Sequence, residues 1–113
     1  MKRAILLNNA VLDLSIRCID RIKEMLCDEM HISMENLRET ISSNPSLKDE
    51  VFDLVVDAEK NSKKKILKDE EVDEADLIIC SLVYRDDPIF SSAMDSIGRK
   101  RMNKLAELGL HMN

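Results

Sequence analysis

Glycine, proline and aromatic residues are scarce in this chain of 113 residues. It contains two glycines, two prolines and no tryptophan, and aromatic residues make up 3% of it. β-Sandwiches and barrels need many turns and favour aromatic and β-branched residues, so this composition argues strongly against an all-β fold. Long apolar runs are also missing. The longest lie at 4–7 and 77–80, whereas a membrane-spanning helix needs about 20 apolar residues, so we expect no membrane partner.

The residues that are abundant indicate one folded domain over 1–113. Hydrophobic residues make up 44% of the chain and charged residues 35%, which is typical of a globular protein. The net charge of −5 is unevenly spread along the chain. Residues 47–87 carry 7 basic and 13 acidic groups, whereas residues 88–113 carry 4 basic and 2 acidic groups. Only the C-terminal segment can therefore approach an anion without repulsion.

The cysteine pattern indicates a reducing compartment. Cys18, Cys27 and Cys80 are an odd number and have no Cys-x-x-Cys spacing, so free thiols are expected rather than a disulfide framework. We expect all three to act as small apolar residues and the protein to be cytoplasmic.

Apolar residues recur with a period near 3.6, which predicts an all-α fold, a small bundle of four to five helices. The segment 77–84 also suits a buried strand, but no other segment offers it a sheet partner, so we favour a helix there. Asp87 and Pro88 are typical of a helix start, and Gly109 followed by Leu110 is typical of a Schellman stop. The expected helices are 4–30, 34–43, 47–61, 70–85 and 88–108, and a continuation of the third helix through the lysines that follow stays open.

The first helix has an unusually wide apolar face. Leu12, Ile16, Ile19 and Leu26 form one stripe on it. Such a face is buried against two neighbouring helices, or against one neighbour and a partner subunit. The second alternative predicts a dimer or higher homo-oligomer, and the seven methionines suit adaptable contact surfaces. The leading hypothesis is a non-catalytic helical interaction, adaptor or regulatory protein without a cofactor, acting through self-association and a protein partner.

Two pairs of carboxylates suggest an alternative. Glu50 and Asp53 share one helix face, and Asp73 and Asp76 share a face of the next helix. If these two helices form an antiparallel hairpin with its midpoint between 64 and 65, Asp53 faces Asp76 and the four carboxylates converge. Such a group of hard oxygen ligands suits Mg²⁺ with a substrate phosphate.

The same residues carry a resemblance to a known family. The order Asp49-Glu50-x-x-Asp53, then Asp73-x-x-Asp76-Leu77-Ile78-Ile79, resembles the acidic signature of the MazG-like all-α nucleoside triphosphate pyrophosphohydrolases. The resemblance implies a helical oligomer that hydrolyses nucleoside triphosphates to monophosphates and pyrophosphate. It also implies that Mg²⁺ is held by Glu50, Asp53, Asp73 and Asp76.

The basic part of the last expected helix suggests a further alternative. Arg99, Lys100, Arg101 and Lys104 lie in the segment of net positive charge and form a candidate anion or phosphate site. Four cations on one helix are a modest signal for nucleic acid, because no aromatic residues or reading-head motif accompany them. The third hypothesis is therefore a nucleic-acid-associated accessory protein that uses this helix.

Overall fold

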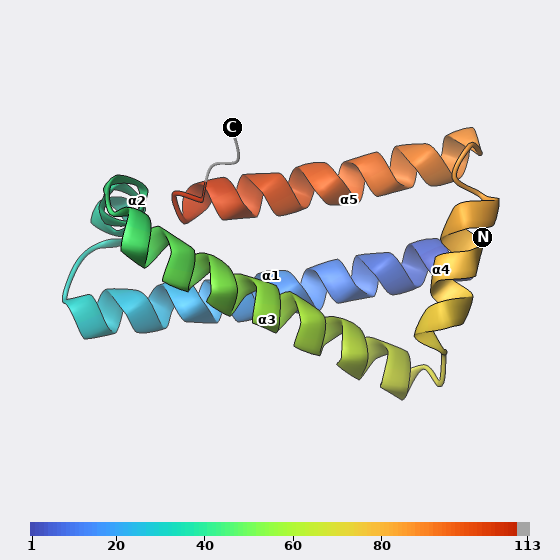
Figure 1. Ribbon diagram of the computed structural model, residues 1–113, viewed down its shortest axis with the longest axis horizontal. Helices are drawn as coiled ribbons and strands as arrows, with labels where there is room; N and C mark the ends of the chain where they lie inside the picture. Colours follow the sequence, from blue (N-terminus) through green and yellow to red (C-terminus); the bar gives the residue numbers. More distant parts are fainter. Residues whose placement is uncertain (111–113) are drawn as a thin grey trace.

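Five α-helices make up the computed structural model, which describes residues 1–110 (Figure 1). No strand occurs in this range, so the all-α prediction is confirmed and the segment 77–84 is helical up to Val83. None of the helices over residues 1–110 is long and apolar enough to cross a membrane. The helices are α1 (Lys2–Met30), α2 (Met34–Ser43), α3 (Pro45–Asp69), α4 (Glu74–Val83) and α5 (Pro88–Glu107).

Polar side chains start four of the five helices by accepting a hydrogen bond from a free backbone N–H in the first turn. Ser33 caps α2, and Asp87 caps α5 as the sequence predicts. The expected start of α3 is residue 47, whereas the helix begins two residues earlier. Asn44 accepts a hydrogen bond from the Leu47 N–H at 3.2 Å, and Pro45 occupies the first turn, where its missing N–H costs nothing.

The predicted Schellman stop of α5 is confirmed. The Leu110 N–H donates to the Leu105 carbonyl and the Gly109 N–H donates to the Ala106 carbonyl, both at 3.0 Å. Gly109 takes a φ of 77°, in the left-handed region that glycine enters without strain. Leu105 and Leu110 are both buried in the same cluster, which supplies the hydrophobic contact that accompanies this motif.

Of the two ends left open for this helix, the structure has the later one, because α3 continues through the lysine-rich segment to Asp69. Lysine is a good helix former, and Ser62 and Leu67 in this segment are buried. The chain then turns at Glu71, which has a φ of 55°, with the Val72 N–H bonded to the Leu67 carbonyl at 2.9 Å. The helix expected from residue 70 therefore starts later, and α4 begins at Glu74.

The long helix α1 is the centre of the fold. It packs against α3, α5, α2 and α4. Figure 1 shows α3 and α5 running along α1, with α2 at one end and the short α4 lying across the other end, beside the N-terminus. The molecule is elongated, with extents of 45 × 28 × 19 Å.

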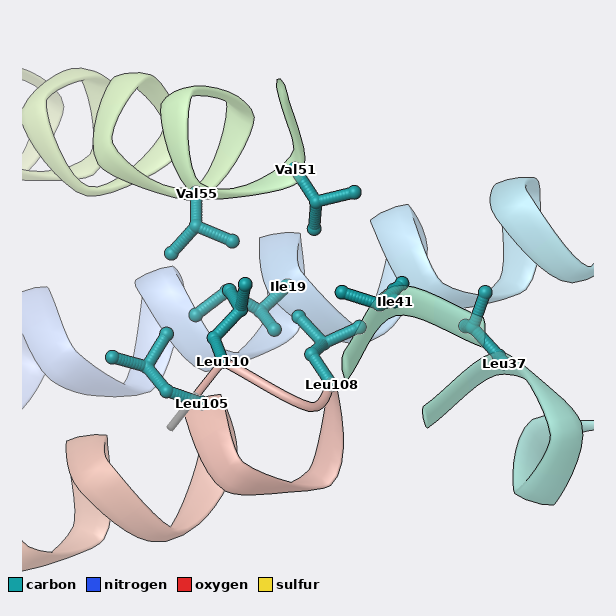
Figure 2. Close-up of a cluster of buried hydrophobic side chains, with 8 residues drawn as sticks. All are labelled: Ile19, Leu37, Ile41, Val51, Val55, Leu105, Leu108 and Leu110. Carbon is teal, nitrogen blue, oxygen red and sulfur yellow. The ribbon is translucent and has the colours of Figure 1, made fainter. Parts of the chain in front are cut away.

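The buried residues form two clusters, one toward each end of α1. The cluster near α2 joins four helices and the chain after α5 (Figure 2). Its members are Ile19, Leu37, Ile41, Val51, Val55, Leu105, Leu108 and Leu110. The cluster near α4 is smaller, and its members are Ala4, Leu7, Leu67, Leu77 and Phe90.

Candidate functional site

The outer side of α4 is an exposed apolar surface. Leu77 is 6% exposed and is the buried residue of this helix. The opposite side carries four large apolar residues that are each at least half exposed. They are Ile78 (50%), Ile79 (57%), Leu82 (61%) and Val83 (67%), and we call them the α4 arc.

Helical geometry gathers these four side chains on one face. Residues four apart lie about 40° apart around a helix, so Ile78 lies beside Leu82 and Ile79 lies beside Val83. Leu77 points to the other side of the helix, toward α1, against which α4 packs. A helix that is apolar all round is normally covered on all sides. Within residues 1–110 only one side of α4 is covered.

Charge is absent from this surface. No charged residue occurs from 77 to 84, and the acids of α4, Glu74 and Asp76, lie in its first turn. Asp73 before them caps the helix, with its carboxylate accepting a hydrogen bond from the Ala75 N–H at 3.2 Å. The acids of α4 itself therefore lie at its N-terminal end, where the helix dipole stabilises them, and the exposed Arg85 and Asp86 follow its C-terminal end.

The self-association face expected on α1 is largely covered within one chain. Leu12 is 6% exposed and Ile19 is 1% exposed. Ile16 and Leu26 are half-buried, and Leu26 packs against the cluster near α2. Of the two alternatives for this wide apolar face, the described residues show burial against neighbouring helices. Leu12 and Ile19 are thus not available to a partner in this conformation.

The sequence does not mark α4 as a helix with an exposed apolar side. The signal for α4 is a segment of eight residues, 77–84, without a charge. By itself such a segment indicates full burial, and only the packing shows that one side of this helix stays uncovered.

The four carboxylates expected to hold Mg²⁺ do not converge. Glu50 and Asp53 are exposed near the start of α3, whereas Asp73 and Asp76 lie at the start of α4. The expected hairpin does not form, because α3 runs straight past its midpoint to Asp69. From Asp53 to that end, α3 extends about 24 Å at 1.5 Å per residue. No group of three or more His, Cys, Asp or Glu side chains in residues 1–110 is arranged to hold a metal ion, so these residues do not fit the ion.

Two of the four basic residues expected to bind an anion are held in ion pairs. Arg101 donates two hydrogen bonds to Glu59, at 2.6 and 3.1 Å. The ammonium of Lys104 lies 2.8 Å from the carboxylate of Asp20 and 3.0 Å from that of Glu107. Arg99 and Lys100 are exposed. The expected basic cluster is therefore split into two residues that link helices and two that face solvent.

These ion pairs change the pKa values of their members. The hydrogen bond to Glu59 raises the pKa of Arg101, and the hydrogen bond to Asp20 raises the pKa of Lys104. The hydrogen bonds from Lys104, and then from Lys23 at 3.1 Å, lower the pKa of Glu107. All three shifts favour the charged forms, so this network stays ionised at neutral pH.

Comparison of this chain with models of known families, with curated proteins and with solved structures finds no match.

Proposed function

We propose that this chain is a non-catalytic helical interaction protein that self-associates through the α4 arc. The observation that carries the proposal is the exposure of Ile78, Ile79, Leu82 and Val83 on one side of a helix whose other side is buried. Free thiols at Cys18, Cys27 and Cys80 support a reducing location such as the cytoplasm.

A second copy of the chain is the occupant that the chemistry of the arc favours. In a two-fold symmetric contact the same surface meets itself, so any charge on it faces an identical charge. The α4 arc carries no charge and can meet itself without this repulsion. The two acids of α4 itself, Glu74 and Asp76, are confined to its first turn, and Arg85 and Asp86 follow its other end. An antiparallel arrangement of the two α4 helices would place these acids at opposite ends of the contact.

The size of the arc predicts a reversible dimer. Burying the exposed part of one such side chain contributes about 1 kcal/mol. Four side chains from each of two copies then contribute about 8 kcal/mol, which is comparable with the cost of association, about 4–15 kcal/mol. The ten residues of α4 are about 15 Å long, which is short for a standard interface of about 800 Å² per partner. We therefore expect a weak, transient dimer whose population rises with protein concentration.

Sedimentation velocity over a wide range of protein concentration tests this proposal. We expect the average sedimentation coefficient to rise with concentration in the wild type and to stay at the monomer value in Leu82→Glu. Leu54→Glu is the matched control, because Leu54 is 49% exposed on α3 and lies far from α4.

Two outcomes would contradict the proposal. One is a wild type that remains monomeric at the highest concentration reached. The other is an equal loss of association in Leu82→Glu and Leu54→Glu, which would show that any added charge disrupts it. Circular dichroism spectra of both variants establish that they are folded.

A further inference from the structure

A groove crosses the middle of the molecule between α3 and α5. Both helices pack against α1, but they diverge from each other along their length (Figure 1). The space that they leave over α1 has a volume of about 350 Å³ and lies away from the α4 arc. This groove is lined by residues from α1, α3 and α5 and does not belong to the surface already described.

The walls of the groove are mainly apolar. Val11 and Leu12 of α1, Val56 of α3 and Ile97 of α5 contribute apolar side chains from three helices. Leu12 is buried, whereas the other three are half-buried and leave part of their side chains uncovered. An apolar concave surface with a few polar groups is the usual form of a small-ligand site.

Some of the cations on the rim of the groove already form an ion pair with a carboxylate, and one does not. Arg101 and Glu59 line the groove but are bound to each other, and Lys63 is bound to Glu74 at 3.0 Å. Lys60 also lines the groove, is exposed, and makes no ion pair with any described residue. Among residues 1–110, the rim therefore offers the ammonium of Lys60 to a ligand beside an apolar floor.

The volume of the groove is that of a small-ligand site. Its 350 Å³ lies within the range of such sites, about 300–1,000 Å³.

We propose that this groove binds a single-chain amphiphile with an anionic head, either a carboxylate or a phosphate monoester. The alkyl chain lies on Val11, Val56 and Ile97, and the head group pairs with Lys60. This arrangement removes apolar surface of both ligand and protein from water and keeps the charged head at the exposed rim, where its solvation is retained.

Isothermal titration calorimetry with octanoate, octyl phosphate and 1-octanol, each below its aggregation limit, tests the proposal. We expect one octanoate or octyl phosphate bound per chain and weaker binding of 1-octanol. The tighter of the two anions identifies the head group as carboxylate or phosphate. Binding of 1-octanol as tight as that of both anions would overturn the role of Lys60.

Variants of the rim and the floor locate the ligand. Lys60→Gln is expected to weaken octanoate binding about 3- to 5-fold, the range of one exposed ion pair. Lys64→Gln, the same change at an exposed residue of α3 outside the groove, is expected to have no effect. Val56→Asp is expected to abolish binding, with its circular dichroism spectrum showing that it is folded. Equal affinity in Lys60→Gln and wild type would overturn the proposal.

The same titration in Leu82→Glu separates this site from the self-association surface. Binding is expected to be unchanged in that variant, because the groove does not include α4. Loss of binding in Leu82→Glu would place the amphiphile on the α4 arc and would contradict the proposal that it binds in the groove. A monomeric wild type that still binds one octanoate per chain would contradict the proposed function and leave the groove supported.

Discussion

The guanidinium of Arg101 donates two hydrogen bonds to the carboxylate of Glu59, at 2.6 and 3.1 Å, and so connects α5 to α3. These two helices both pack against α1, and Arg101 and Glu59 both line the groove between them. A two-point contact of this kind fixes orientation as well as distance, because the planar guanidinium must face the carboxylate. It therefore sets the width of the groove at the end where Arg101 lies.

Breaking this contact should lower stability. Both side chains are partly exposed, at 34% and 23%, so solvent screening limits the interaction to about 1 kcal/mol. A double-mutant cycle with Glu59→Gln and Arg101→Met, measured by urea unfolding, is expected to show a coupling of this size. The control cycle uses Lys65 and Asp69, which lie 3.6 Å apart and are 64% and 57% exposed. Equal coupling free energies in the two cycles would contradict the prediction that the Arg101–Glu59 contact stabilises the fold more than an exposed ion pair does.

The two glycines should respond in opposite directions to alanine. A Cβ at Gly109 would collide with the carbonyl oxygen of Arg38 and the hydroxyl of Ser42, and its φ of 77° disfavours any side chain. Gly109→Ala should lower the free energy of unfolding by more than the roughly 1–2 kcal/mol of left-handed strain. Gly98 lies inside α5, where an added Cβ would meet no atom within 4 Å, so Gly98→Ala should raise the free energy of unfolding by about 0.5–1 kcal/mol. Thermal unfolding of both variants checks these two predictions. A Gly109→Ala variant that is more stable than the wild type would contradict the prediction for Gly109.

The cluster near α2 should be the more sensitive part of the core. Leu105 is fully buried and lies in a cluster built from several helices. Leu105→Ala is expected to lower the free energy of unfolding by about 2–5 kcal/mol, through lost burial and the cavity that remains. Leu54→Ala removes the same atoms from a side chain that is 49% exposed. This substitution should lower the free energy of unfolding far less. Denaturant unfolding measures both variants. Similar losses of unfolding free energy in Leu105→Ala and Leu54→Ala would contradict the burial of Leu105 in the core.

Stability should fall on the acid side partly through Glu107. The pKa of Glu107 is lowered from 4.5 by Lys104 and Lys23. The stabilisation is therefore present at neutral pH and lost as the pH falls through 4.5 toward the lower pKa of the folded state. Glu107 is 51% exposed, so screening limits the effect to about a few tenths of a kcal/mol.

Melting temperature measured against pH checks the contribution of Glu107. Glu107→Gln should flatten the acid limb of this plot. The control is Glu24→Gln, because Glu24 is an exposed acid of α1 that forms no ion pair within residues 1–110. It should leave the acid limb unchanged, and an equal flattening in both variants would contradict the assignment to the Lys104 and Lys23 contacts.

Local signals in the sequence predict the helix boundaries where a specific residue type enforces them. Asp87 before Pro88, and Gly109 before Leu110, define the limits of α5 because capping and left-handed backbone need those residue types. The turn after α3 uses Glu71 at a positive φ, where glycine is usual. With no glycine to mark this turn, the sequence leaves the end of α3 open, and the structure places it at Asp69.

The candidate site depends on long-range packing and is predicted less well. The convergence of Asp53 with Asp76 requires a hairpin near residue 64, and the continuous α3 removes it. Likewise Arg101 and Lys104 form part of a predicted basic cluster, but Arg101 pairs with Glu59, 42 residues away, and Lys104 pairs with Asp20, 84 residues away, besides its neighbour Glu107. No local pattern identifies such pairs.

The sequence by itself determined that the chain is helical, because apolar spacing, caps and the scarcity of turn residues act over a few neighbouring residues. The tertiary structure decided which apolar faces are covered: α3 and α5 lie on α1 and bury Leu12 and Ile19, whereas the outer side of α4 is left bare. The physical reason is that the same helical period describes a face against a neighbour and a face open to solvent. Which of the two applies depends on where the other helices pack.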